Sequence, residues 1–429
     1  MNGIRSRPPT FTATGGLVNG RLKLPPNAAM LLLASIIVSF LAASSAPTPL
    51  YAVYQRQWGF SAITTTIIFG VYALAVLATL LTLGKASDYI GRRPVLLAAI
   101  AVQAVAVILF ATADSIAALL VARVVQGLST GAAVAAVGAA MLDIDRTRGA
   151  VANSFAPGIG TAVGALASAL VVQNLPAPTH LIYLILLGIF ALQAIGVAAI
   201  AETAAAKPGV LAGMIPDVRL PRPVRRSIAI AAPVLFAVWA LAGFYGSLGP
   251  ALVATLVHSR SAVFAGLGPF ILAGVAAASV MLLRNTPSRT IMLVGVVALI
   301  AGVSVTLVST SLGSPAGFFI GTAIAGIGFG SGFQGGIRLV LPLAQAHERA
   351  GVLSLLYVVS YLGMGLPAVM GGVLVVESGG LLVTAREYGI AVIVLAAVAL
   401  VGLMLPQPEP MRDCGSHASP SREGACLVG

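Results

Sequence analysis

Charged residues are rare in this sequence, yet four of them fall within eleven positions. Only 8% of the 429 residues are charged. The stretch GKASDYIGRRP, residues 84–94, contains Lys85, Asp88, Arg92 and Arg93. A carboxylate can stabilise the amino-terminal end of a helix, and a basic side chain can pair with an acid at the end of another helix. Gly84 and Gly91 allow tight turns. The stretch therefore predicts a loop that makes and breaks ion pairs.

A second polar group lies inside an apolar stretch. Arg123 and Gln126 belong to ARVVQGLSTGAA, residues 122–133. Arg123 is about eight residues into its helix, roughly 12 Å deep, and thus near the middle of a membrane about 30 Å thick. A charge there costs at least about 2.5–3.5 kcal/mol on insertion scales and usually serves function. Arg123 is a candidate for binding a solute or coupling an ion. A structural role, bonded to carbonyls or to Gln126, stays open.

Patterns for catalysis and for metal binding are missing from the sequence. There is no Ser/His dyad, no HExxH and no pair of carboxylates within an apolar stretch. The GxxxxGK[ST] phosphate loop is absent too. Cys414 and Cys426 both lie in the polar carboxy-terminal tail, where no disulfide framework is implied. We therefore expect that the protein is not an enzyme and that it has neither a cofactor nor a metal site.

The elements that position these residues are expected to be membrane-spanning helices. The chain is 59% hydrophobic, with a mean hydropathy of +1.02. Twelve apolar stretches are each long enough to cross a bilayer as a helix. They are 28–49, 61–83, 94–112, 115–141, 149–173, 180–201, 227–250, 261–283, 290–310, 315–341, 350–375 and 386–406. The predicted fold is an all-α membrane protein.

The basic residues orient these helices. With both termini in the cytoplasm, 20 of the 24 Lys and Arg fall on the cytoplasmic side, and only Arg56, Arg260 and Arg386 fall in outer loops. The net charge of +12 therefore reflects membrane topology, and we expect no nucleic-acid partner. The predicted parts are a cytoplasmic tail at 1–27, six helices at 28–201, a cytoplasmic central loop at 202–226, six helices at 227–406 and a second cytoplasmic tail at 407–429.

The two groups of six helices show a weak internal repeat. At an offset of 201 residues, Gly127 aligns with Gly328 and Gly131 with Gly332. Repeated halves of this kind are common in secondary transporters. Chance matching between glycine-rich helices is the alternative. The repeat predicts two pseudo-symmetric six-helix bundles.

The opening stretch resembles the loop between helices 2 and 3 of the major facilitator superfamily, which reads roughly G-x-x-x-D-x-x-G-R-[RK]. The matching residues are Gly84, Asp88, Gly91, Arg92 and Arg93. ARVVQG likewise resembles the helix 4 motif of that family. The resemblance implies a cytoplasmic gate in which Asp88 faces the amide end of helix 11. Arg92 would then pair with Asp143 or Asp145 at the inner end of helix 4. Topology alone is the alternative role for the basic residues.

The same resemblance implies a transporter whose central cavity is lined by helices 1, 4, 7 and 10. The candidates for binding the solute or coupling an ion are Arg123, Gln126, Trp239, Tyr245 and Gln334. A cavity with one arginine, aromatic rings and no acid suits a neutral or anionic, partly aromatic solute. We expect a monomer in contact with membrane lipid, with protons as the candidate coupling ion. Efflux of a drug or metabolite is the first hypothesis, and uptake of a vitamin or organic anion is the alternative.

Overall fold

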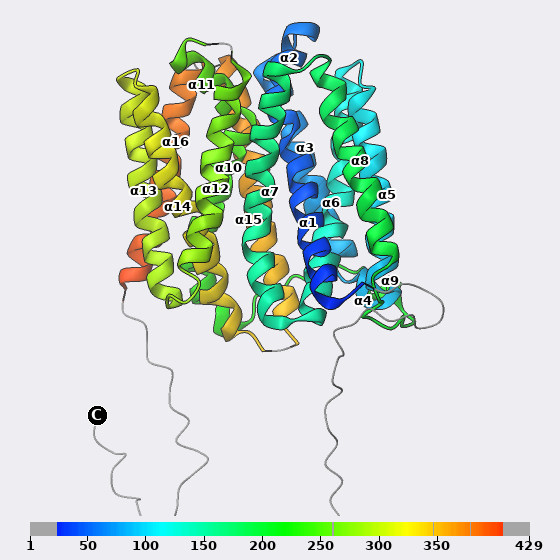
Figure 1. Ribbon diagram of the computed structural model, residues 1–429. Coiled ribbons are helices and arrows are strands. Elements are labelled where there is room, and N and C mark those ends of the chain that lie inside the picture. Colours follow the sequence, from blue (N-terminus) through cyan, green and yellow to red (C-terminus); the bar gives the residue numbers. More distant parts are fainter. Residues whose placement is uncertain (1–23, 260, 346, 378, 406–429) are drawn as a thin grey trace, which may run out of the picture.

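A computed structural model describes residues 24–405 apart from 260, 346 and 378, and in this part of the chain the structure is helical, without strands (Figure 1). The helices of the first half are α1 (Pro26–Ser45), α2 (Pro47–Trp58), α3 (Ala62–Leu83), α4 (Ala86–Ile90), α5 (Arg92–Ala111), α6 (Ile116–Ile144), α7 (Arg146–Asn174) and α8 (Pro178–Ala198). Most of the two expected tails and Arg260 lie outside the described residues.

The second half follows a connecting segment with two short helices, α9 (Val210–Gly213) and the 3₁₀ turn η1 (Arg222–Val224). Its helices are α10 (Arg225–Ser247), α11 (Gly249–Val257), α12 (Ala262–Leu282), α13 (Ser288–Ser311), α14 (Pro315–Val340), α15 (Arg349–Glu377) and α16 (Leu381–Met404), with the 3₁₀ turn η2 (Leu341–Leu343) after α14. Twelve helical spans in the described residues are long and apolar enough to cross a membrane, which confirms the expected count.

Local sequence sets where several of these helices begin. The hydroxyl of Ser115 accepts the N–H of Ala118 at the start of α6. The carboxylate of Asp145 accepts the N–H groups of Thr147 and Arg148 at 2.9 Å, which caps α7. Prolines occupy the first turn of α1, α2, α8 and α14, where no N–H bond is lost.

Two expected outer loops are helical instead. The first span continues through α2, so Arg56 lies in the last turn of a helix. The last span begins at Leu381, five residues before the expected start, which places Arg386 inside α16. The reason is that a helix satisfies its own backbone beyond the apolar core of a membrane, and hydropathy marks only that core.

Each half has its own hydrophobic core. One core gathers buried residues from Ala29 to Ile200, and the other gathers them from Val224 to Leu403. A small third cluster joins the halves, because Phe69 and Tyr72 of α3 pack against Met364 of α15. Figure 1 shows α4 and α9 at one end of the bundle and α2 at the other. We call these the α4 end and the α2 end.

The halves meet along two seams, α3 against α15 and α7 against α12. Glycines let the helices approach closely there. A Cβ atom at Gly372 of α15 would overlap the side chain of Thr66 on α3. A Cβ atom at Gly266 of α12 would lie 2.6 Å from Cβ of Ala169 on α7. The seams are therefore narrow enough to admit glycine alone at these points.

Helix packing does not support the glycine alignment drawn from the sequence repeat. Gly127 of α6, the fourth span, faces Tyr72 and Ala75 of α3, the second span. Gly328 of α14, the tenth span, faces Leu299 of α13, the ninth span. The glycines of α14 that face the eighth span, α12, are Gly326 and Gly330. The alignment of Gly127 with Gly328 therefore matches a face that packs on the second span with a face that packs on the ninth, and these two faces are not equivalent in the two halves.

Candidate functional site

The loop at the α4 end is organised around Arg92. Its Nε donates to Oδ2 of Asp143 at 3.0 Å, and Nη1 donates to Oγ of Ser87 at 2.7 Å and to the carboxylate of Asp88. The side chain of Arg92 is only 12% exposed. The ion pair expected between Arg92 and Asp143 is present, and it joins α5 to α6 within the first half. It does not cross to the second half.

Asp88 lies elsewhere than expected. Its carboxylate pairs with Arg92 four residues later and is 49% exposed. None of the hydrogen bonds found between described residues joins Asp88 to α15. Because α4 is a single turn of helix, it places Asp88 directly beside Arg92 in the same loop. The nearby guanidinium therefore holds this carboxylate, where the family resemblance implied a helix end in the other half.

Glu202, which the sequence analysis missed, caps α5. Its Oε1 accepts the backbone N–H of Arg92 at 2.7 Å, and its Oε2 accepts that of Arg93 at 2.9 Å. A carboxylate at this position also complements the positive amino-terminal end of the helix. Arg93 contributes its backbone N–H to this arrangement. No local pattern announces the cap, because 110 residues separate Glu202 from Arg92.

The cap explains why position 91 is glycine. Gly91 has φ +109°, a region that residues with a side chain rarely adopt, and a Cβ atom there would lie 2.9 Å from Oε2 of Glu202. Both the backbone angle and the space beside the carboxylate exclude a side chain. At Gly84 a Cβ atom would overlap the carbonyl oxygen of Leu80. The two glycines that frame the loop are therefore required by its geometry.

Gly91→Ala is expected to lower the melting temperature of the purified protein by several degrees. A strained backbone conformation of this kind costs about 1–3 kcal/mol, and the methyl group displaces the carboxylate that caps α5. Gly188→Ala is the matched control, because a Cβ atom at Gly188 meets nothing within 4 Å. Its melting temperature should stay level or rise. Equal melting temperatures for the two variants would show that the loop does not depend on Gly91.

Arg123 is fully buried in the first half and holds several polar partners. Its Nε donates to the hydroxyl of Tyr51 at 3.0 Å, and Nη2 donates to the same oxygen. Its Nη1 donates to the carbonyl of Ser44 at 2.8 Å and to Oε1 of Gln126 at 2.7 Å. Gln126 in turn donates to the carbonyl of Ala43 at 3.0 Å. The structure thus joins Arg123 and Gln126 to the end of α1 and the start of α2.

Aromatic rings complete the surroundings of this guanidinium. The Cζ atom of Arg123 lies 5.6 Å from the ring centre of Tyr51, 5.3 Å from that of Tyr72 and 5.6 Å from that of Phe110. Such rings attract a cation, most strongly where water is excluded. No ion pair to Arg123 occurs among the described residues. The positive charge is therefore solvated by dipoles and rings and is not neutralised.

Trp239 of α10 lies where the halves meet. Its ring centre is 5.5 Å from Phe333 and 6.0 Å from Phe329 of α14, and 5.2 Å from Tyr361 of α15. It also packs against the cluster of α3 and α15 that contains Tyr72. Its indole N–H is buried without a hydrogen-bond partner in the described part of the chain. This aromatic group presents an unused donor at the seam.

The other two candidates of the second half, Tyr245 and Gln334, do not lie beside Trp239. The hydroxyl of Tyr245 bonds with that of Thr322 at 2.6 Å inside the second core. Gln334 follows Phe333, but its helix face lies between those of Gly330, which meets α12, and Gly335, which meets α13. A turn of 100° per residue separates it from the rings around Trp239. Tyr245 and Gln334 thus face the interior of the second half.

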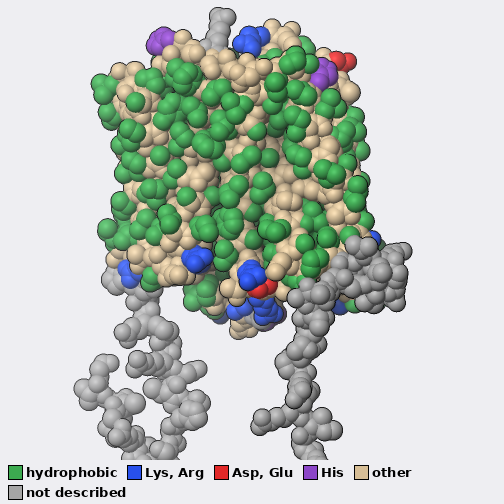
Figure 2. Space-filling view, viewed as in Figure 1, with side chains coloured by type: hydrophobic (Ala, Val, Ile, Leu, Met, Phe, Trp, Pro, Cys, Tyr) green, Lys and Arg blue, Asp and Glu red, His purple; other side chains and the backbone are tan. Residues whose placement is uncertain are grey.

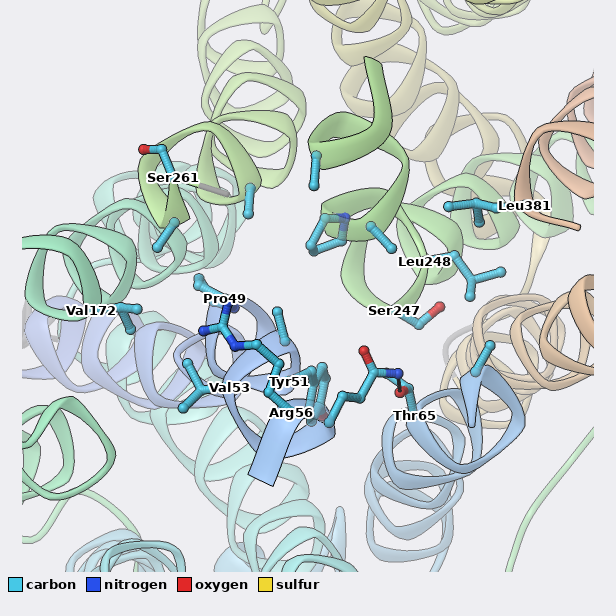
Figure 3. Close-up of a pocket in the computed structure, with 18 of the residues that line it drawn as sticks. Pro49, Tyr51, Val53, Arg56, Thr65, Val172, Ser247, Leu248, Ser261 and Leu381 are labelled. Carbon is cyan, nitrogen blue, oxygen red and sulfur yellow. Dashed lines mark hydrogen bonds between the residues drawn. The ribbon is translucent and has the colours of Figure 1, made fainter. Parts of the chain in front are cut away.

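A cavity of about 320 Å³ lies between the halves at the α2 end. Both halves line it, with Tyr51, Thr65 and Val172 on one side and Ser247 and Leu381 on the other (Figure 3). Its lining contains Arg56 and no acidic residue. Tyr51 connects the cavity to the guanidinium, because this residue lines the cavity and its hydroxyl accepts a hydrogen bond from Arg123.

Sequence comparison agrees with this architecture. The family model described as Major Facilitator Superfamily matches residues 31–316, well over half of the chain. The chain belongs to the major facilitator superfamily. Members of this superfamily are transporters, and the protein is a multi-pass membrane transporter of small solutes. Among curated proteins, no sequence matches this one.

Solved transporters share the superfamily fold with this protein. A mutant of the nucleoside transporter NupG aligns with a TM-score of 0.64 and 13% identity, over 87% of this chain and 98% of that one. A POT family transporter in complex with 5-aminolevulinic acid aligns with a TM-score of 0.69 and 14% identity, over 90% of this chain and 97% of that one. Identities this low show the fold alone.

Proposed function

We propose that the protein exports a small organic solute, a drug or a metabolite, by alternating access between its two six-helix halves. The observation that carries the proposal is the cavity at the α2 end, which both halves line and to which Tyr51 contributes. Alternating access needs a site between two bodies that can move against one another. The separate hydrophobic cores of the halves support such movement.

The α4 end is taken as cytoplasmic. Lys and Arg gather at this end in Figure 2, while the flank of the bundle is covered by hydrophobic side chains. Cytoplasmic loops carry such an excess of basic residues. The cavity at the α2 end would then open to the outside. The group of Arg92, Asp88 and Asp143, with Gly84, Gly91 and Arg93 in the same loop, would act as part of the cytoplasmic gate.

We infer the class of solute from the chemical groups at Arg123 and Trp239. Arg123 offers a positive charge that no carboxylate neutralises. Trp239 offers an indole N–H without a partner among the described residues, and Tyr72 lies between the two. These groups favour a neutral or anionic solute with an aromatic part. Gln126 orients Arg123, whereas Tyr245 and Gln334 would act indirectly, from within the second half.

Uptake of a nutrient such as a vitamin or organic anion is the second candidate. One observation favours it, because every acidic residue in the described helices lies within about two turns of a helix end, and none lies deep in the membrane where proton-driven exporters often carry one. The resemblance of residues 84–96 and 122–133 to transporter motifs favours efflux. Export and uptake predict different phenotypes for a strain that lacks the gene.

Direction can be tested with a strain that lacks the gene and a strain that overproduces the protein. Under export, the deletion raises the intracellular level of the solute and the sensitivity to it. Under uptake, the deletion creates a growth defect that external solute corrects only when the protein is present. A melting-temperature screen of the purified protein against organic anions and aromatic drugs supplies the probe. No stabilising compound and no phenotype in either strain would count against both directions.

Asp88→Asn is expected to abolish transport while leaving membrane insertion intact. The change removes the charge that pairs with Arg92 but keeps the size of the side chain, so the gate loosens without a change in fold. Transport rate and the amount of protein in the membrane are both measured. Asp114→Asn is the matched control, because Asp114 is an exposed acid near the α2 end. Normal transport by Asp88→Asn would refute the gating role.

A further inference from the structure

The segment that connects the halves, residues 202–221, runs along the α4 end and contacts both of them. We call it the strap. On the first half, the N–H of Lys207 donates to the carbonyl of Tyr89 at 2.7 Å. Gly213 of α9 packs so closely on the ring of Tyr89 that a Cβ atom there would overlap it. With the cap from Glu202, the first part of the strap is fixed to α4 and α5.

The strap then bridges to the second half through two neighbouring residues. Oδ2 of Asp217 lies 3.7 Å from Nζ of Lys85, which lies between α3 and α4. Oδ1 of the same carboxylate lies 2.6 Å from Nε of Arg219. The backbone N–H of Arg219 donates to the carbonyl of Gly351, in the first turn of α15, at 3.2 Å. One carboxylate and one backbone bond thus connect the junction of α3 and α4 to α15.

The residue type at position 351 fits this bridge. Gly351 is buried, and a Cβ atom there would lie 2.8 Å from Cγ and 3.0 Å from Cβ of Arg219. A side chain at this position would push the strap away from α15. The start of α15 is therefore shaped to receive the strap, and contact between them is not incidental.

We propose that the strap is a lock that holds the α3–α15 seam closed at the α4 end and must release before that end opens. The proposal rests on alternating access as the proposed function. The two contacts are made by residues two positions apart, and two residues of extended chain span at most about 7 Å. If Lys85 and Gly351 separate by much more than they do here, one of the contacts breaks. An exposed ion pair is weak enough to break in every cycle.

The lock can be tested without any solute. The reporter is Leu80→Cys, at the α4 end of α3, in a protein that carries Cys414→Ser and Cys426→Ser. The rate at which N-ethylmaleimide modifies this cysteine in lipid nanodiscs measures how often the seam opens. Asp217→Asn is expected to raise the rate about two- to fivefold, the range for one exposed ion pair. Lys85→Gln should do the same, and the double variant should add nothing further.

Asp114→Asn is again the matched control, and its labelling rate should equal that of the parent. Equal rates for Asp217→Asn, Lys85→Gln and the parent would overturn the lock, as would an equal increase in the Asp114→Asn control. Because labelling does not depend on transport, a faster rate in a protein that moves no solute would support the lock and count against the proposed function alone.

Discussion

Replacing Arg123 by glutamine is expected to lower the rate of solute transport at least about a hundredfold, because the change removes the charge proposed to meet the solute, and a buried charged contact is worth on the order of 3 kcal/mol or more. Initial rates in proteoliposomes, corrected for the amount of inserted protein, measure the effect. Arg386→Gln serves as the control, since Arg386 is exposed on α16.

The melting temperature of the same variant distinguishes function from structure. Removing the buried charge gains about 2.5–3.5 kcal/mol on insertion scales. Against this, the partners left unpaired cost about 1–3 kcal/mol each. For the three partners the loss is about 3–9 kcal/mol if none finds a new bond. The amide group of glutamine can bond one or two of them again, which brings the two terms close to balance. Arg123→Gln should therefore fold and melt at or somewhat below the temperature of the wild type. A large drop in melting temperature with residual transport would instead favour the structural role.

The Arg123→Lys variant is also expected to lose solute transport. The guanidinium reaches Tyr51, the carbonyl of Ser44 and Gln126 at the same time from three nitrogen atoms. An ammonium group has one nitrogen and cannot reproduce that fork. Charge alone therefore does not suffice. Wild-type transport by the lysine variant would mean that the solute responds only to the sign of the charge.

Gly266→Val is expected to reduce transport about tenfold or more by keeping the α7–α12 seam from closing near the α2 end. Gly266 lies on the α7–α12 seam, where a Cβ atom would be 2.6 Å from Cβ of Ala169 and 2.8 Å from the carbonyl oxygen of Ala165. The valine side chain forces the helices apart, and overpacking of this kind costs about 1–3 kcal/mol or more. That cost falls on any arrangement in which α7 and α12 touch at this point, as they do here.

The separation of the two helices in Gly266→Val can be measured directly by cysteine labelling. A cysteine introduced at Ala52, an exposed residue that lines the cavity, should react faster with a maleimide in Gly266→Val than in the parent. Gly188→Val supplies the control, since its site on α8 is open. It should leave both labelling and transport unchanged. Normal transport by Gly266→Val would show that the α7–α12 seam does not have to close at this point.

Features written within a short stretch of chain were predictable. The apolar lengths gave the number of spans, and the depth of Arg123 in one of them gave its burial. The pair between Arg92 and Asp143 followed from the family motif. The partners of these residues were not predictable in the same way. Tyr51 lies 72 residues from Arg123 along the chain, and nothing local marks it as the hydroxyl that holds the guanidinium.

The rotation of a helix about its axis was the second limit. Gln334 is polar in an apolar helix, and on that ground it was expected to face the solute. Glycines occur all around α14, and they pack on α10, α12 and α13 in turn. With glycine on every side, no apolar stripe marks the buried face, so sequence periodicity cannot orient the helix. The neighbouring helices decide the orientation, and they turn Gln334 away from Trp239.

The cap on α5 has a consequence for biosynthesis. Ribosomes add about 5–20 residues per second, so the loop after α4 is made several seconds or more before Glu202, 110 residues later. Until then, no carboxylate accepts the N–H groups in the first turn of α5. The first half is therefore completed only when its last helix has been inserted. A chain that ends at residue 201 should be more sensitive to protease at this loop than one that ends at residue 206.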